Sequence, residues 1–458
     1  MGVVTYEHIS ISGFEYERIL GLRIEHNINT HSKADIVCEV TGQQGMETLS
    51  ALKTDDYVMV SYTADAGAGV LFYGVCQSKE LVFAGEYYKL HIILASTSIL
   101  LDKKKENKTF QNSQQYISDI MGAVVKGRAI INFHMTDKPV GELVVQHEET
   151  AWECVKRLAS HCNARVIANI TTQVPVIDIG KNPEEEAGEK PLELLWPKDA
   201  PQRKIDEALM RPVEISPWDI TAFNSWSGTI EMKDGVLTKT TYRLKDSDYL
   251  QERTYNSQIS GLILTGIVKD VDRNMVKVFF DQIDERYDAA TNKWFEYTTA
   301  YAGNGGEYGS GIYFMPEVGD RVRVFFPNEN EDCGVAFASE IVSPLASERM
   351  MNWKSPGGQE ILFTEYGIQI TGKKDSVFIQ LIEDENNDAG IYIVCDKNIS
   401  ILSESDDSTS DNAIVLKAER DVMIYADQQI KLETNSDILE IDKGKICFQT
   451  ENLYLMDD

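Results

Sequence analysis

The C-terminal part of the sequence repeats every eight residues. Isoleucine or valine stands at successive eight-residue steps, at Ile414, Val422, Ile430, Ile438 and Ile446. Leu453 follows Ile446 after seven residues, and a second apolar residue stands two places after most of these positions, at Leu416, Ile424, Leu432, Phe448 and Leu455. Alternation with a period of two is typical of a strand that buries one face, and the polar residues between repeats are typical of turns. The sequence therefore predicts short strands joined by polar corners over residues 391–458.

Such strands cannot bury their apolar residues within one chain. Eight residues supply one strand and one corner, so a single chain would need several repeats to close one coil. If three chains wind together, each repeat supplies one side of a triangular prism and no sheet edge stays exposed. We therefore predict a trimeric β-helix, a spike whose core is formed by Ile414, Leu416, Val422, Ile424, Ile430, Leu432, Ile446 and Phe448. Its tip residues are predicted to be Leu453, Tyr454, Leu455 and Met456.

The repeat allows one alternative fold and contains one exception. The strands could instead belong to an ordinary β-sandwich, which shows the same alternation. Glu440 stands where the repeat expects an apolar residue, and Leu439 and Ile441 flank it. Because a slip of one residue moves a side chain to the other face of a strand, this exception predicts a change of register at Glu440.

Composition excludes some classes of partner. The 458 residues have room for three or more domains, and the formal net charge of −29 argues against nucleic acid and anionic membranes. The seven cysteines are odd in number and lack metal-type spacing. The first residues do not read as a signal peptide, so we expect synthesis in the cytoplasm with reduced thiols.

The order of predicted elements indicates a mainly β fold with several domains. One helix is predicted after Thr150, because Thr150 and Glu153 form a capping box before an apolar stripe. Five short strands with a long middle hairpin predict an oligonucleotide/oligosaccharide-binding (OB) fold. The predicted domains are a first β-barrel at 1–100, an α/β insert at 101–180, a Pro-rich connection at 181–217, second-barrel strands at 218–260, the OB fold at 261–345 and the β-helix at 346–458.

The OB segment carries a resemblance to a known family. It contains Gly266-Ile267-Val268, then Val276-Lys277-Val278-Phe279-Phe280, then Pro316-Glu317-Val318-Gly319 before a strand at 321–326, and a closing strand at 334–341. This order is similar to the OB module of valine-glycine repeat protein G (VgrG) and of phage baseplate spike proteins. Phe110-Gln111-Asn112 and the helical segment 145–159 resemble the hub domain of the same family.

The resemblance implies a structural, non-enzymatic protein without cofactors. The family forms the trimeric hub and membrane-piercing spike of phage tails, type VI secretion systems and related extracellular particles. It implies two barrels per hub protomer, so that three chains match a hexameric tail tube protein. Other implied partners are baseplate proteins, a tip protein of the proline-alanine-alanine-arginine (PAAR) repeat class and the target cell envelope on firing. Members with a lysozyme or a C-terminal effector have extra segments, which we do not expect here.

Two other functions remain open at this point. A trimeric β-helix tailspike that binds or degrades surface glycans would need a groove with carboxylates about 5–10 Å apart. A receptor-binding fibre would need a globular head after the repeats. The sequence between Leu455 and its end at Asp458 leaves little room for such a head.

Few residues suggest a metal, phosphate or nucleic-acid binding site. All seven histidines lie within the first 162 residues, and His147 and His161 are too far apart for ordinary helical metal spacing. The His-x-His iron site at the tip of some family spikes is therefore not expected, and we predict no metal site. The glycines of 302–311 predict a flexible loop, since no Gly-Lys-Ser/Thr follows them. Residues 259–342 hold fourteen acidic and seven basic residues, which argues against nucleic-acid binding.

Overall fold

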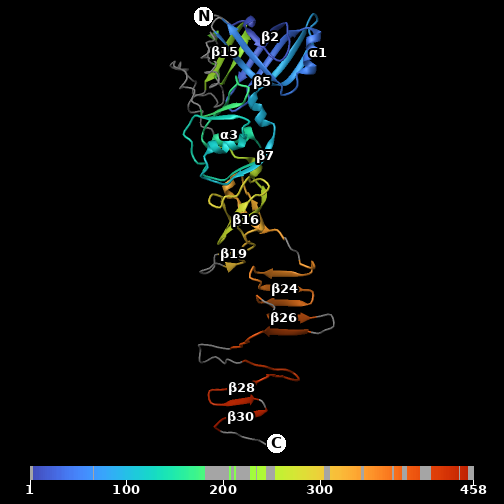
Figure 1. The fold of residues 1–458 in the computed structure, drawn as a ribbon, viewed down its shortest axis with the longest axis vertical. Helices are drawn as coiled ribbons and strands as arrows, with labels where there is room; N and C mark the ends of the chain where they lie inside the picture. The colour runs from blue at the N-terminus through green and yellow to red at the C-terminus, as the bar shows by residue number, and fades with distance from the viewer. Residues whose placement is uncertain are drawn as a thin grey trace. The chain divides into compact units, whose positions relative to one another are not determined.

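The structure is a computed structural model, and it describes most of the chain. The described residues are 4–64, 67–180, 206–207, 211–212, 227–233, 235–243, 253–303, 310–341, 345–373, 376–383, 389–402, 414–442 and 444–451. The chain divides into two compact units, residues 1–342 and residues 343–458 (Figure 1). Most of the predicted Pro-rich connection and the whole predicted tip lie outside the described residues.

The first unit begins with a ten-stranded antiparallel sheet. Its order is β1-β4-β5-β6-β3-β2-β14-β15-β12, with β13 also paired to β15. The strands are β1 (Ile9–Ile11), β2 (Arg18–His26), β3 (Lys33–Val40), β4 (Tyr57–Ala64), β5 (Gly67–Phe83), β6 (Tyr88–Ser96), β12 (Asp206–Glu207), β13 (Arg211–Pro212), β14 (Ser227–Lys233) and β15 (Val236–Arg243). Alternate side chains pack into one core that includes Ile24, Ile36, Phe72 and Leu90.

The strands predicted for a second barrel join this same sheet. β14 pairs with β2, for example Gly228 opposite His26, and β15 pairs with β14. The division into two hub barrels stays a prediction. The short helices η1 (Tyr6–His8) and η2 (Thr97–Asp102) flank the sheet. Helix α1 (Gly42–Ala51) was not predicted, because it faces the sheet with small residues, and a Cβ at Gly45 would lie 2.5 Å from a methyl carbon of Leu81.

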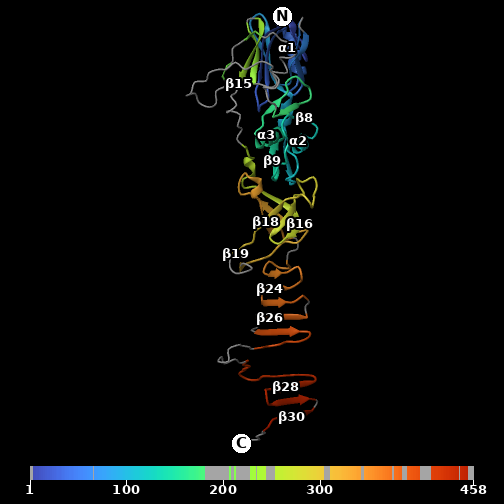
Figure 2. The ribbon, with the colours of Figure 1, turned by 90° about the vertical axis from the view of Figure 1, so that its left-hand side faces the viewer.

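The α/β insert contains two helices and two small sheets (Figure 2). Its elements are β7 (Lys105–Phe110), α2 (Ile117–Val125), β8 (Ile130–Phe133), β9 (Val144–Thr150), α3 (Ala151–His161), β10 (Val166–Ala168) and β11 (Val176–Ile179). The predicted capping box is confirmed, since Thr150 Oγ1 accepts from the Glu153 N–H and the Glu153 carboxylate accepts from the Thr150 N–H. The apolar faces of α2 and α3 meet in one core that includes Ile120, Val124, Trp152 and Leu158.

The OB fold is confirmed as a closed five-stranded barrel with the order β16-β17-β18-β22-β21. After η5 (Ser257–Ile259), its elements are β16 (Ile263–Asp272), β17 (Met275–Phe279), β18 (Trp294–Tyr297), β19 (Ala302–Gly303), β20 (Ser310–Gly311), β21 (Arg321–Phe325), η6 (Glu331–Cys333) and β22 (Val335–Ser339). Inward side chains such as Val268, Val278, Phe295 and Val324 fill the barrel.

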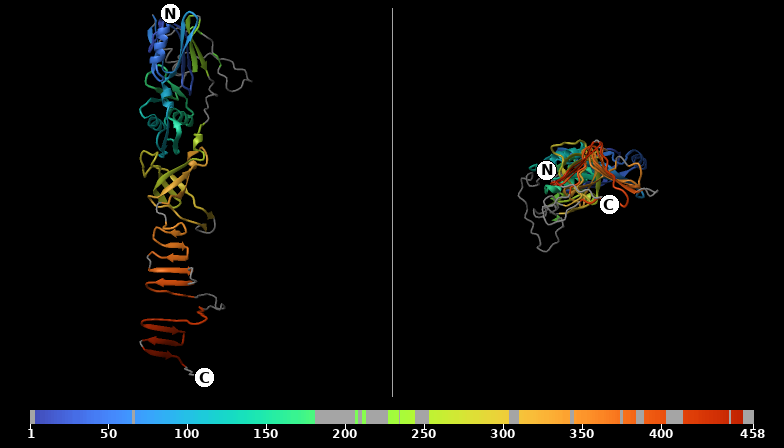
Figure 3. Two further views of the ribbon diagram at one scale, coloured as in Figure 1. Left: turned by 90° about the vertical axis from the view of Figure 1, so that its right-hand side faces the viewer. Right: turned by 90° about the horizontal axis from the view of Figure 1, so that it is seen from below.

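The second unit consists of two antiparallel meanders (Figure 3). The first contains β23 (Met351–Lys354), β24 (Glu360–Thr364), β25 (Gly367–Thr371), β26 (Val377–Glu383) and β27 (Ala389–Cys395). The second contains β28 (Gln429–Glu433), β29 (Ile438–Asp442) and β30 (Lys445–Gln449). Within each meander every strand pairs with the next strand of the same chain, so the trimeric β-helix remains a prediction.

Among the helices that the structure describes, none is long and apolar enough to cross a membrane.

Candidate functional site

One face of the five-stranded sheet is apolar along its whole width. In an antiparallel sheet, residues paired across strands point to the same face. Two rows of paired residues form this face: Met351, Phe363, Ile368, Leu381 and Ile391, and beside them Trp353, Ile361, Ile370, Ile379 and Ile393. The opposite face is mixed, with the polar residues Asn352, Glu360, Gln369 and Gln380 beside apolar ones such as Leu362. We call the ten residues of the two rows the five-stranded apolar face.

The three-stranded sheet is built in the same way. Its apolar face consists of Ile430, Leu432, Leu439, Ile441, Ile446 and Phe448, again in paired rows. Glu440 pairs with Lys431 and Cys447 on the other face. Leu439 and Ile441, which flank Glu440, lie on the apolar face, and Ile438 lies on the other face. The pairing of the three strands is continuous through Glu440, so the change of register predicted there stays a prediction.

These two faces have no covering layer in a single chain. No described residue between 345 and 451 is buried, whereas the first unit contains three apolar cores. Trp353 is 58% exposed and Ile391 is 71% exposed. A sheet needs a second layer against its apolar face to be stable in water. An exposed apolar surface of this extent marks an interaction site.

The predicted spike-core residues are exposed in the single chain, apart from the half-buried Ile430. Leu432, Ile446 and Phe448 belong to the apolar face of the three-stranded sheet. Ile414, Leu416, Val422 and Ile424 lie in segment 414–428, which is described but contains no strand. Their placement on a spike axis stays a prediction, and the predicted tip residues Leu453 to Met456 lie outside the described residues.

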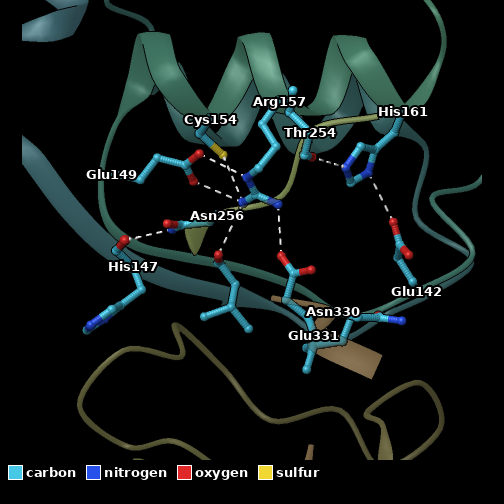
Figure 4. A network of polar contacts seen from close by, with 12 residues as sticks. Glu142, His147, Glu149, Cys154, Arg157, His161, Thr254, Asn256, Asn330 and Glu331 are labelled. Atoms are coloured by element: carbon cyan, nitrogen blue, oxygen red, sulfur yellow. Dashed lines mark hydrogen bonds and ion pairs between the residues drawn. The ribbon is translucent and has the colours of Figure 1, made fainter. Parts of the chain in front are cut away.

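A buried ionic network connects the insert to the OB barrel (Figure 4). Arg157 of α3 is 3% exposed, and its Nε and Nη2 donate to the two carboxylate oxygens of Glu149, each at 2.9 Å. Its Nη1 donates to Glu331 Oε1 at 2.8 Å. Glu149 belongs to the insert and Glu331 to η6 of the barrel. One guanidinium is therefore shared by carboxylates from two domains.

The charges of this network stabilise one another. Burial alone would lower the pKa of Arg157, because it disfavours the charged form. The hydrogen bonds to Glu149 and the charges of Glu149 and Glu331 outweigh burial, so the pKa of Arg157 lies above its usual value. Burial raises the pKa of Glu331, and Arg157 opposes that change. Removing one member of a buried ion pair leaves an uncompensated charge and is strongly destabilising.

His161 contacts a carbonyl oxygen and a carboxylate of neighbouring segments. Its Nε2 lies 2.9 Å from the Thr254 carbonyl oxygen and its Nδ1 lies 3.0 Å from Glu142 Oε1. Among the described residues there is no group of three or more histidine, cysteine, aspartate and glutamate side chains placed to bind a metal. These contacts fasten the end of α3 to neighbouring segments.

A serine, a histidine and an aspartate lie together in the first unit, which sequence reasoning missed. His31 Nδ1 is 2.8 Å from Ser98 Oγ, and His31 Nε2 is 3.3 Å from Asp102 Oδ2. The same three residue types form a Ser-His-Asp triad, but there Nε2 faces the serine and Nδ1 faces the aspartate, so the two ring nitrogens are exchanged here. However, Ser98 is 1% exposed, and a nucleophile must reach its substrate. Burial also lowers the pKa of His31, and the neighbouring Asp102 opposes that shift.

This cluster instead fastens α3 to the large sheet. The His31 ring stacks on Trp152 with the ring centres 4.4 Å apart. Thr150 Oγ1, which caps α3, donates to Asp102 Oδ1 at 2.5 Å. Ser98 and Asp102 are close in the sequence, but His31 lies 67 residues before Ser98 and 71 residues before Asp102, so no local pattern could have indicated their meeting.

Asp284 occupies a cleft of about 520 Å³ between the insert and the OB barrel. Gln111 Nε2 donates to its Oδ2 at 2.8 Å, the Phe280 N–H donates to the same oxygen at 2.8 Å, and Thr109 Oγ1 donates to Oδ1. Burial raises the pKa of Asp284 to about 7, although these hydrogen bonds oppose the shift. The carboxyl therefore titrates near neutral pH.

We expect Asp284→Asn to change how the unfolding free energy depends on pH. The folded pKa of Asp284 lies above its unfolded value, so its contribution to stability is complete below about pH 4 and is lost as pH rises through about 7. Asparagine does not ionise, so the variant does not lose this stability as pH rises. Between pH 5 and pH 8, the free energy of unfolding measured in urea should rise by about 1–3 kcal/mol in the variant relative to the parent. The exposed Asp288→Asn is the control, and an equal gain there would contradict the assignment.

Comparisons with known proteins agree with this architecture in the OB domain. Residues 264–339 match the family described as "Type VI secretion system/phage-baseplate injector OB domain". No curated protein matches the chain. The predicted resemblance to VgrG-like hub and spike proteins is thus confirmed on the segment that carried it, which is a minor part of the 458 residues.

Several solved structures are similar to the chain at low identity. An Escherichia coli protein, c3393, described as a type VI secretion component similar to T4 bacteriophage tail proteins gp27 and gp5, is 15% identical; the match covers 73% of this chain and 99% of that one, with a TM-score of 0.43. The Francisella PdpA–VgrG complex in its lidded form is 8% identical, covering 84% and 79% with a TM-score of 0.48. A tail protein from Neisseria meningitidis MC58 is 12% identical, covering 44% and 58% with a TM-score of 0.30.

Proposed function

We propose that the protein is the hub and spike subunit of a contractile injection system and acts as a homotrimer. The observation that carries this proposal is the presence, in one chain, of an injector OB domain followed by a unit that has two apolar sheet faces and in which no described residue is buried. The matched family is described as the OB domain of type VI secretion and phage-baseplate injectors. A coreless sheet beside it needs further copies of itself to form a rigid body.

In a trimer, the apolar face of each chain can be covered by the other two chains. If three sheets turn their apolar faces toward a common axis, each sheet forms one wall of a prism and covers the other two. The opposite face, which carries more polar residues, then lies in water. Burial contributes about 25 cal/mol for each Å² of apolar surface removed from water, so the ten large apolar side chains of the two rows provide a strong driving force in each chain. The product is a narrow body that resists bending.

The remaining partners follow from this role. The hub formed by residues 1–260 is proposed to dock a hexameric tail tube protein, and baseplate proteins would surround it. A PAAR-like tip protein would cap the end formed by residues 453–456, and the target envelope is the partner on firing. The protein would work mechanically, without enzymatic activity or a nucleic-acid ligand. Its location would be an assembled particle, after synthesis in the cytoplasm.

The central test is the oligomeric state of the full chain. We expect a trimer of 51.6 kDa chains that persists at low micromolar concentration, since the second unit has no core of its own. Sedimentation velocity and native mass spectrometry both report the mass. A folded monomer would refute the proposal, and a dimer would indicate that two sheets pack as a sandwich instead.

A further inference from the structure

The insert and the OB barrel meet across a seam with an apolar centre. Strand β9 and the residue before it contribute side chains to both cores: Val144 packs in the core of the insert, while Leu143 and Val145 pack in the core of the barrel. The alternation of a strand explains this division, because successive side chains point to opposite faces. The Leu143 N–H also donates to Asp332 Oδ1 of the barrel at 3.1 Å.

Two sets of polar contacts also join the insert to the barrel. In the first, Arg157 is held by Glu149 of the insert and by Glu331 of the barrel. In the second, Gln111 Nε2 donates to the Val278 carbonyl oxygen at 3.0 Å and to Asp284 Oδ2 at 2.8 Å. Arg157, Glu331 and Gln111 are 3%, 1% and 6% exposed, so water does not screen these contacts.

Apolar contacts alone do not fix an orientation. The hydrophobic effect is proportional to the area covered and has no direction, so an apolar seam permits small rotations at little cost. A guanidinium that donates to two carboxylates has defined geometry, and buried charges become costly as soon as a partner moves away. The Gln111 amide adds a second fixed point, which prevents rotation about the first.

We infer that Arg157 is a positioning residue that locks the OB barrel onto the α/β insert in a single orientation. Together with the contacts of Gln111, it makes the two domains one stiff body. The functional role of this stiff connection rests on the proposed function, because a spike must transmit axial force from the hub to the tip without bending between domains. The lock itself lies within one chain, and its existence does not depend on the oligomeric state.

The test uses hydrogen–deuterium exchange on the full-length protein. The Leu143 amide crosses the seam, so its exchange reports seam opening, whereas the Ile120 amide of α2 reports opening of the insert core. We expect Arg157→Met to speed exchange at Leu143 by about tenfold or more and to leave Ile120 near its parent rate. Arg128→Met, which removes a partly exposed arginine of the same insert, should change neither amide.

A second variant separates positioning from stability. In Arg157→Met with Glu149→Gln and Glu331→Gln, no buried charge is left unpaired, so the melting temperature should recover toward that of the parent. Leu143 exchange should stay fast, because the directional contacts are still missing. Slow exchange at Leu143 in both variants, or an equal rise at Leu143 and Ile120, would overturn the inference. Sedimentation of the same samples tests the trimer independently.

Discussion

Replacing Ile370 by aspartate is expected to abolish assembly of the trimer. Ile370 lies in the second row of the five-stranded apolar face, paired with Ile361 and Ile379. In the proposed prism three copies of this position approach the axis. Three carboxylates would be buried without partners there, at a cost of several kcal/mol each before relaxation or protonation. Sedimentation velocity should show monomers or disordered aggregates in place of the trimer.

Gln369→Asp is the matched control for this experiment. Gln369 is the preceding residue of β25 and lies on the opposite face, where it pairs with Leu362 and Gln380. The same added charge should therefore leave both the trimer and its melting temperature nearly unchanged. If Ile370→Asp also assembled and melted like the parent, the apolar face would not be the contact surface. Ile424→Asp extends the test to segment 414–428, whose inward placement is predicted from the repeat alone.

Replacing Gly266 by alanine is expected to destabilise the OB barrel by about 1–3 kcal/mol or more. A Cβ at position 266 would lie 2.5 Å from Val278 Cγ1 and 2.7 Å from the Phe279 carbonyl oxygen. The side chain of Val278 is fully buried, and the carbonyl belongs to the strand that pairs with β16. Neither group can move without disturbing the barrel, so the added methyl group forces β16 and β17 apart.

Gly122→Ala provides the comparison, since it makes the same chemical change in open space. A Cβ at Gly122 in α2 would meet nothing within 4 Å. Alanine is the better helix former by about 1 kcal/mol, so this variant should be as stable as the parent or slightly more stable. Urea unfolding of both variants at one pH compares them directly. Equal stability of the two variants would mean that the barrel accommodates a side chain at position 266.

Much of the fold could be predicted because its signals are local. The capping box of Thr150 and Glu153 spans four residues, and the structure confirms it. The strands of the OB barrel show alternation and follow one another in a characteristic order, which was enough to identify the barrel. The apolar faces of the second unit also follow from alternation alone, as Ile368 and Ile370 illustrate. The missed helix α1 shows the limit, because its contact with the sheet uses glycine and threonine instead of an apolar stripe.

The repeat of eight residues did not reveal how strands pair. Equal spacing suggested that Ile430, Ile438 and Ile446 share one face. In an antiparallel meander the chain reverses at each turn, so the facing residue depends on turn length as well as on spacing. The structure pairs Ile430 with Ile441 and Ile441 with Ile446, and it places Ile438 on the opposite face.

The sequence by itself determined the OB domain, the capped helix and the presence of apolar strand faces, because each depends on residues within about ten positions of one another. Only the tertiary structure decided that β14 and β15 join the N-terminal sheet, since strand partners are set by the whole chain. It also decided the role of Arg157. Glu331 lies 174 residues away in the sequence, and no spacing rule connects the two. From the sequence alone, a charged residue on a helix is predicted to be exposed, because the partners that allow its burial come from distant segments.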